Sequence, residues 1–226
     1  MKTCKSFLII GFLSLIALAA CKSEDDYHEK MRLISKSIED HPQRSEDWLR
    51  LIEYSKSNDL WERIYAYQFL VALAPNQIGS RRVELIAIFK RGLLDADYGV
   101  KKLAAQGTQA IGPEGVNSNF LELLSILKPK NEDDLTWLTA ESLGETNDPD
   151  KAALAFDALM DAARKPNFNY PREAPQLKII ALKAALKLAR NGLIEDTASY
   201  FSDQMTESDP MIRELIDEYK KELKNH

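Results

Sequence analysis

Four segments of this chain repeat one pattern of apolar and small residues, and this repetition constrains the fold more than any other feature. Each segment can be stacked on the others without gaps and ends with an aliphatic residue followed by a small one. Apolar or small residues recur at positions 1, 2, 5, 6 and 9, which is the spacing of one face of an α-helix. The pattern predicts similar helices that bury equivalent faces. The four segments are Tyr65–Ala74, Leu103–Gly112, Leu135–Gly144 and Ile180–Ala189.

Helix start and stop signals divide the rest of the chain. The first helix is expected from about Glu24 to Asp40, because Pro42 does not allow it to continue. Strand signals are almost absent, since the chain holds four valines and no long alternating run, so an all-α fold is expected. Later helices are expected to begin at capping residues, namely Ser45, Asp59, Ser80, Asp97, Asn117 or Ser118, Asp133, Asp148 and Asp209. Helix ends are expected at Pro75, Gly112–Pro113, Pro129, Gly144 and Asn191–Gly192.

Residues 1–20 are typical of a secretion signal. Lys2 and Lys5 precede the uncharged run Phe7–Ala20, which is shorter than the ~20 apolar residues that a membrane-spanning helix needs. The run ends in Leu18-Ala19-Ala20-Cys21, which resembles the lipobox of bacterial lipoproteins. That resemblance implies cleavage before Cys21 and attachment of lipid, with acyl chains such as palmitate, to this cysteine. The alternative is a plain signal followed by a buried free cysteine.

The residue after the cysteine bears on the destination of such a lipoprotein. Lys22 stands where an aspartate commonly retains bacterial lipoproteins in the inner membrane, so the resemblance implies the outer membrane, facing the periplasm. The acidic run Lys22–Asp26 also resembles tags that send some lipoproteins to the cell surface. A helix start explains the same run, because Ser23 can cap a first turn whose acidic residues favour the helix dipole, and we favour this explanation.

The repeated segments resemble the second helices of HEAT repeats, which are antiparallel helix pairs stacked into a solenoid. Ser142–Pro149, followed by Lys151–Ala153, is similar to the signature that joins adjacent HEAT units. The resemblance implies an α-solenoid of about five helix pairs, a HEAT-like superhelix, after a cleaved signal peptide. The expected organisation is a signal at 1–20, a lipidated N-terminus and capping helix at 21–45, HEAT-like repeats at 46–192 and a C-terminal helical hairpin cap at 193–226.

The sequence predicts no cofactor, no metal site and no catalytic site. Its three histidines, His28, His41 and His226, lack the paired spacing of metal ligands. No phosphate-binding loop and no nucleophile elbow is present. A net charge of −5 gives no general attraction for nucleic acid. We therefore expect a protein that is not an enzyme and does not bind nucleic acid.

Two features are candidates for binding a partner protein. If the apolar positions of the repeated helices face inward, positions 4 and 7 face outward. Their mixed, amide-rich character suits a protein better than a phosphate ligand, although an ordinary solvated face is an equal alternative. The outward residues are Gln68, Val71, Gln106, Gln109, Leu138, Glu141, Lys183 and Leu186. The second candidate is the proline-rich segment 166–176 with Phe168 and Tyr170, whose aromatic rings alternatively cover neighbouring helices.

Together these features predict a membrane-anchored periplasmic lipoprotein that acts as an interaction scaffold or assembly factor for an envelope protein. One alternative is a glycan- or peptidoglycan-binding module, which an exposed groove lined by Trp61, Trp137 and Tyr67 would favour. The other alternative is an enzyme, which a deep pocket joining His28 to carboxylates of shifted pKa would favour.

Overall fold

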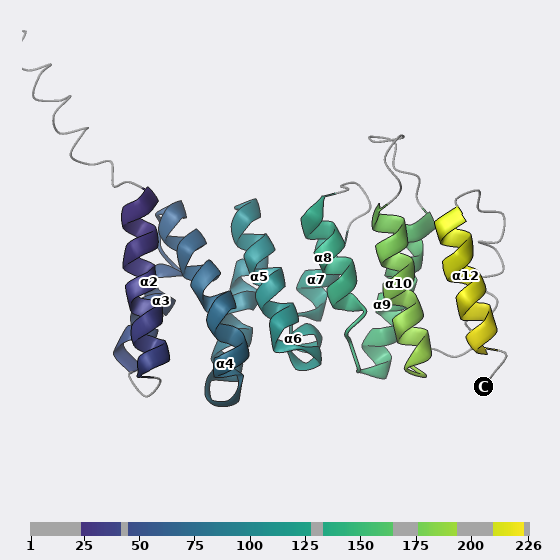
Figure 1. Ribbon diagram of the computed structural model, residues 1–226, viewed down its shortest axis with the longest axis horizontal. Helices are drawn as coiled ribbons and strands as arrows, with labels where there is room; N and C mark the ends of the chain where they lie inside the picture. Colours follow the sequence, from purple (N-terminus) through teal and green to yellow (C-terminus); the bar gives the residue numbers. More distant parts are fainter. Residues whose placement is uncertain (1–23, 42–44, 128–132, 165–175, 194–209, 224–226) are drawn as a thin grey trace, which may run out of the picture. The chain divides into compact units, whose positions relative to one another are not determined.

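The computed structural model describes residues 24–41, 45–127, 133–164, 176–193 and 210–223. All regular structure within these ranges is helical, which confirms the predicted all-α fold (Figure 1). No helix in this part of the chain combines the length and the apolar character needed to cross a bilayer. The chain divides into two compact units, residues 1–69 (unit 1) and residues 70–226 (unit 2), which are described separately.

Unit 1 contains α2 (Glu24–Asp40), α3 (Ser45–Tyr54) and the first part of α4 (Leu60–Leu93). Helix α2 ends at the residue that the sequence indicated and packs against α3. The core of the unit includes Met31, Trp48 and Leu51, whose side chains are fully buried. An apolar stripe along each short helix therefore holds this unit together.

Helix α4 consists of two helical stretches that meet at Arg81, where the backbone is not helical (φ −126°, ψ 16°). The first stretch runs past Pro75, so the predicted helix end lies several residues too early. A proline removes one backbone hydrogen bond and crowds the preceding turn, which bends a helix without necessarily ending it. Leu73 and Ala74, directly before the proline, are fully buried. The predicted helix start at Ser80 lies one residue before this break, so the second stretch begins close to where the sequence indicated.

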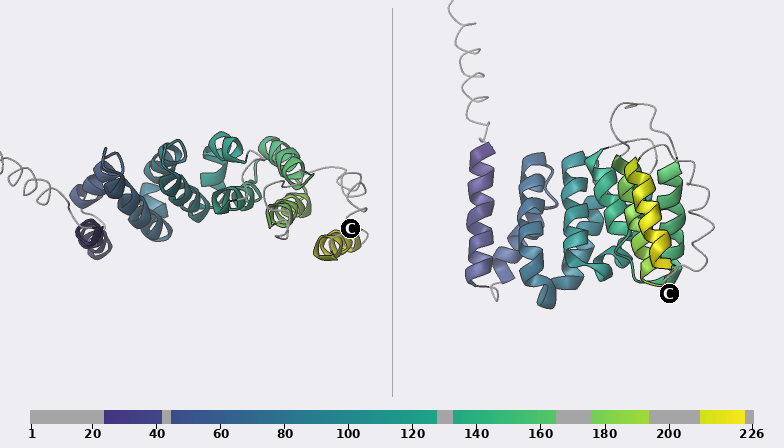
Figure 2. Two further views of the ribbon diagram at one scale, coloured as in Figure 1. Left: turned by 90° about the horizontal axis from the view of Figure 1, so that it is seen from above. Right: turned by 45° about the vertical axis from the view of Figure 1, so that its right-hand side comes forward.

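Unit 2 continues from the second part of α4 with helices that contact their neighbours in order. Helices α5, α8 and α10 lie side by side, and α12 follows α10 (Figure 1; two further views in Figure 2). Helix α7 packs on α8 and α9, and α9 packs on α10. Their bounds are α5 (Tyr98–Ile111), α6 (Pro113–Ser118), α7 (Phe120–Ile126), α8 (Asp134–Leu143), α9 (Pro149–Arg164), α10 (Gln176–Arg190) and α12 (Pro210–Leu223).

Three of the predicted caps of unit 2 form as expected. Asp97 Oδ1 accepts a hydrogen bond from Val100 N at 3.0 Å, and Asp133 Oδ1 accepts one from Thr136 N at 2.8 Å. Asp148 Oδ1 accepts from Asp150 N at 3.2 Å, directly before Pro149 opens α9. These side chains bind backbone N–H groups that have no partner inside the helix, as their positions in the sequence predicted.

The segment between α5 and α7 differs from the prediction. Instead of a connection followed by a helix at Asn117 or Ser118, the chain forms α6 directly after Gly112. Gly112 has a φ of +86°, which a residue without a Cβ adopts readily, and Pro113 suits the first helical position. The Gly-Pro pair therefore ends one helix and begins the next. Helix α7 follows Asn119, whose Nδ2 donates inward to the buried Thr108 Oγ1 at 3.1 Å instead of capping the helix.

Small residues allow two of these helices to approach closely. Gly144, at the end of α8, faces Ala184 of α10. A Cβ atom added to Gly144 would lie 2.8 Å from Ala184 Cβ and 3.0 Å from Ala184 Cα. The small last residue of the repeated pattern thus has a definite role, because it sets the spacing between neighbouring helices.

We expect Gly144→Ala to lower the free energy of unfolding by about 1–3 kcal/mol, the usual cost of overpacking. The backbone of α10 must move, since Ala184 Cα cannot rotate away. Gly79→Ala is the control, because nothing lies within 4 Å of a Cβ at Gly79 and alanine favours the helix there by about 0.5–1 kcal/mol. Urea unfolding of both variants measures the two effects, and equal effects would contradict the close approach.

Candidate protein-interaction surface

The repeated helices of unit 2 bury the positions that the sequence assigned to the inside. In α8, the residues at positions 1, 2, 5, 6 and 9 are all buried, and in α5 four of the five are buried. Position 3 is also buried in α5 and α10, at Ala105 and Leu182, which the pattern did not indicate. The inward face is therefore broader than predicted, because each of these helices has neighbours on more than one side.

The outward positions differ in how much solvent they meet. Glu141 and Lys183 are exposed, and Gln106 and Gln109 are half-buried. These four residues occupy equivalent positions on three helices that lie side by side, and we call them the second-helix row. Gln68, on α4, is exposed in unit 1.

Leu186 is the exception among the outward positions. The sequence placed it outward, but its side chain is buried, so this expectation is wrong. Helix α10 is contacted by α8, α9 and α12, so little of its circumference remains free. The next residue, Lys187, extends to the turn that follows α8, where its Nζ binds the Glu145 carboxylate.

A hollow of about 690 Å³ opens near the N-terminal ends of α5 and α8. Its lining is mixed, with apolar side chains from Leu93, Leu94, Ile126 and Leu135 and polar groups from Lys101, Ser125, Asp133 and Thr136. Leu94 is 66% exposed, and several other large apolar side chains of the described residues are exposed as well. The volume falls in the range of ligand-binding clefts, and the mixed lining offers both apolar contacts and hydrogen-bonding groups.

Beside this hollow, Asp134 accepts hydrogen bonds from two residues of α5. Tyr98 Oη donates to Oδ1 and Lys102 Nζ donates to Oδ2, while Leu135 N donates to Tyr98 Oη at 3.3 Å. Lys102, followed by Tyr98, holds the pKa of the Asp134 carboxyl below its usual value. Burial and the bond to Asp134 raise the pKa of Tyr98 to about 12. At neutral pH the carboxyl is thus ionised and the phenol protonated, which suits structural clamping and not proton transfer.

Unit 1 contains a similar clamp. Tyr27 Oη donates to Asp59 Oδ2 at 2.7 Å, and Lys30 Nζ lies 3.4 Å from Glu62 Oε1. The bond to Asp59 raises the pKa of Tyr27 to about 12. In both units, a tyrosine and a lysine of one helix bind acidic residues at the start of another helix.

These clamps follow a spacing that the sequence analysis missed. A basic residue pairs with an acidic residue 32 positions later at Lys30–Glu62 and at Lys102–Asp134. The same spacing joins Lys90 Nζ to Glu122 Oε1 at 3.2 Å, and Arg82 Nη1 to Glu114 Oε2 at 2.5 Å. Helical periodicity is a property of one segment. It therefore gives no sign of ion pairs between residues of two successive repeats.

The described residues give the enzyme alternative no support. His28 is exposed on α2, and its ring contacts Tyr65 and Phe69 at centroid distances of 5.5 and 5.6 Å. Within the described ranges, the resolved carboxyl pKa shifts are downward, as at Glu29 beside Arg32 and at Asp148 beside Lys151. A general acid near neutral pH requires a raised carboxyl pKa. In the same ranges, no group of three or more His, Cys, Asp or Glu side chains is placed to hold a metal.

The arrangement that would favour glycan binding does not form. Tyr67 is 1% exposed and belongs to the core of unit 1, so it cannot line an open groove. Trp61 is exposed on the same helix, and Trp137 is half-buried on α8 in unit 2. The three aromatic residues therefore do not provide one shared stacking surface within either unit.

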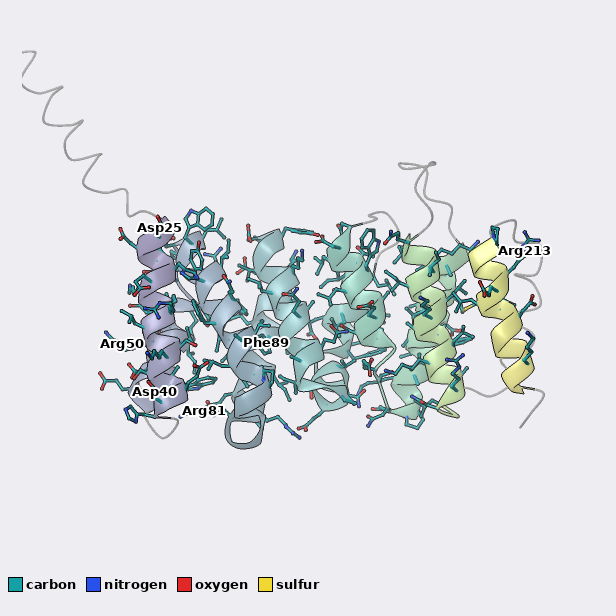
Figure 3. All side chains as sticks on the ribbon, viewed as in Figure 1. Asp25, Asp40, Arg50, Arg81, Phe89 and Arg213 are labelled. Carbon is teal, nitrogen blue, oxygen red and sulfur yellow. The ribbon has the colours of Figure 1, made fainter. Side chains whose placement is uncertain are left out.

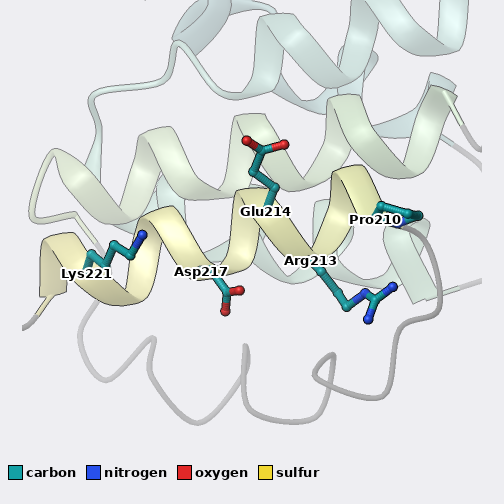
Figure 4. Close-up of a pocket in the computed structure, with 5 residues that line it drawn as sticks. All are labelled: Pro210, Arg213, Glu214, Asp217 and Lys221. Atoms are coloured by element: carbon teal, nitrogen blue, oxygen red, sulfur yellow. The ribbon is translucent and has the colours of Figure 1, made fainter.

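Some candidates cannot be placed. Cys21, Phe168 and Tyr170 lie outside the described residues. A second hollow, of about 430 Å³, borders α12, whose two basic and two acidic side chains are shown in Figure 4. Glu214 points away from Arg213 and Asp217 in that view, so the charged groups do not converge on one ligand. Since its described lining comes from one helix, this hollow carries no binding argument.

The hydrogen bond from Tyr98 to Asp134 makes the free energy of unfolding depend on pH in the alkaline range. We expect the free energy of unfolding to fall between about pH 10 and pH 12, because the unfolded chain loses the phenol proton near pH 10 and the folded chain near pH 12. Tyr98→Phe removes this contribution, so the stability difference between parent and variant should be constant below pH 10 and should shrink above it. Denaturant unfolding over this pH range measures the difference. A difference that stays constant up to pH 12 would contradict the clamp.

Comparison with known proteins supports the fold. No protein-family model matches the chain, and no curated protein matches its sequence. Solved structures do match, among them an archaeal HEAT-like repeats protein from Thermococcus onnurineus NA1, with a TM-score of 0.54 and 14% sequence identity. The match covers 87% of this chain and 78% of that chain. At this identity the similarity concerns the fold alone. The chain therefore has the fold of an α-solenoid with HEAT-like helical repeats.

Proposed function

We propose that this protein is a lipid-anchored scaffold or assembly factor of a bacterial envelope, and that it binds another protein on the second-helix row of unit 2. The observation that carries this proposal is the side-by-side placement of α5, α8 and α10. Equivalent outward positions therefore lie on helices that are direct neighbours. A row of such positions is the usual binding face of stacked helical repeats.

The chemistry of the row favours a protein partner. Gln106 and Gln109 each offer an amide that both donates and accepts hydrogen bonds, as peptide groups do. Glu141 and Lys183 carry opposite charges, so the row has no surplus charge that would select a phosphate or a nucleic acid. In this proposal, the hollow around Leu94, whose lining is part apolar and part polar, receives an anchoring side chain of the partner.

The proposed anchor is lipid on Cys21, and the lipobox-like residues before it support this assignment. Removal of residues 1–20 would leave Cys21 as the only cysteine, since the other is Cys4. Two or more acyl chains anchor a protein stably, and anchoring raises the local concentration of the scaffold beside envelope partners. The outer membrane, on its periplasmic side, remains the proposed location because Lys22 follows the cysteine.

Site-specific crosslinking tests the binding surface. A photo-crosslinking amino acid at Gln106 or at Glu141, introduced in the native host, should yield the same single crosslinked protein. Leu154 is the matched control, because it is exposed on α9 and lies outside the row. Equal crosslinking from Leu154, or no crosslinks from the row, would contradict the proposed surface.

Mass spectrometry tests the anchor. The protein purified from its host should begin at Cys21 and carry the mass of attached acyl chains, and it should sediment with membranes. Cys21→Ser removes the thiol that accepts the lipid, so this variant should lose the added mass and remain unprocessed. A bare thiol on the native protein would contradict the lipid anchor.

A further inference from the structure

We infer that Leu60 and Trp61, the first two residues of α4, enter the water–lipid interface of the membrane that holds Cys21 and thereby orient unit 1 on the bilayer. This inference rests on the proposed lipid anchor. Its partner is a zwitterionic lipid surface. Three observations carry it, namely the short tether, the position of the start of α4, and the exposure of these two side chains.

The segment between the proposed lipid on Cys21 and helix α2 is too short to let α2 move far from the membrane. Lys22 and Ser23 are the only residues between Cys21 and Glu24, the first residue of α2. Three residue steps of a fully extended chain reach at most about 10 Å. The N-terminal end of α2, marked by Asp25 in Figure 3, is therefore held near the lipid headgroups.

The start of α4 lies at the same end of α2. The bond from Tyr27 Oη to Asp59 Oδ2, at 2.7 Å, joins the first turn of α2 to the residue before α4. One turn further along each helix, Lys30 Nζ pairs with Glu62 Oε1 at 3.4 Å. Two contacts thus align the beginnings of both helices, and the short tether acts on both.

Leu60 and Trp61 are exposed at this end, at 38% and 44% of their surfaces. The Trp61 ring stacks on Tyr65, with ring centroids 6.2 Å apart and an interplanar angle of 27°. Tyr65 in turn meets the edge of the His28 ring of α2. The indole is therefore held in place. Tryptophan combines an apolar body with a polar N–H group, and for this reason it concentrates at membrane interfaces.

The charges at this end select the kind of lipid. Asp25 and Asp26 are exposed on the first turn of α2, whereas Glu29, one turn later, is paired with Arg32 at 2.7 Å. Carboxylates are repelled by the negative potential of anionic lipids, whereas a zwitterionic surface carries no such potential. Two side chains bind a bilayer weakly by themselves, so the lipid on Cys21 supplies the local concentration that makes their insertion effective.

The experiment uses residues 21–226, which retain every described helix. Cys21, the single cysteine of this chain, is coupled to a maleimide phospholipid in phosphatidylcholine vesicles whose acyl chains are brominated. Bromine quenches tryptophan on contact, so the emission of the tethered chain should fall relative to vesicles without bromine. Because the coupling is chemical, this result does not depend on acylation in the host. A bare Cys21 in the host would overturn the proposed function and leave the vesicle measurement interpretable.

Two variants determine which side chains are responsible for the quenching. Trp61→Phe keeps an aromatic ring against Tyr65 and should abolish the quenching, whereas Leu60→Ser keeps the indole and should weaken it. Leu121→Ser is the matched control, since Leu121 is 70% exposed on α7, and it should leave the quenching unchanged. Circular dichroism confirms that each variant is folded. Replacing part of the phosphatidylcholine by phosphatidylglycerol should reduce the quenching.

Several results would overturn the inference. Absence of quenching in the tethered parent chain would exclude insertion of Trp61. Undiminished quenching in Trp61→Phe would assign the contact to another tryptophan. Quenching that rises with phosphatidylglycerol would contradict the selection of a zwitterionic surface.

Discussion

Each helix of unit 2 hides its apolar face against the next helix in order, and the remaining features depend on this lateral packing. A single helix pair cannot bury enough apolar surface to be stable by itself. The close approach of Gly144 to Ala184 shows how tight the contact between α8 and α10 is. Since neighbouring helices are held at such short spacing, equivalent outward positions come together on one surface. The second-helix row exists because the packing beneath it is regular.

Ion pairs between neighbouring helices fix how these helices are aligned along their axes. The apolar contacts are not directional, so they permit small slips between neighbouring helices. The clamp of Tyr98 and Lys102 on Asp134 fixes one helix start against its neighbour, as Tyr27 does with Asp59 in unit 1. Such partly exposed ion pairs contribute little stability each. Their repetition at a spacing of 32 residues indicates that alignment is their main contribution.

Because unit 1 directly follows the proposed anchor, we assign different functions to the two units. In this proposal, the membrane-proximal unit carries the tether and the Leu60–Trp61 edge, and unit 2 carries the partner-binding row. The two roles need different surfaces, since a membrane edge requires exposed apolar groups and a protein-binding row requires mixed polar groups. Each surface is described within one unit, and the two proposals are tested by separate experiments.

The sequence by itself determined the all-α class, most helix starts and the inward face of the repeated helices. Those features follow from local rules, because a capping aspartate such as Asp97 or Asp133 binds N–H groups within three residues of itself. The same rules were wrong at Pro75, since the first stretch of α4 runs past it, and at Asn117 and Ser118, which belong to α6 instead of opening a helix. Only the tertiary structure decided that Leu186 is covered, that Tyr67 is buried and that charges pair one repeat apart. These outcomes depend on which helices become neighbours, and residues distant in the sequence set that choice.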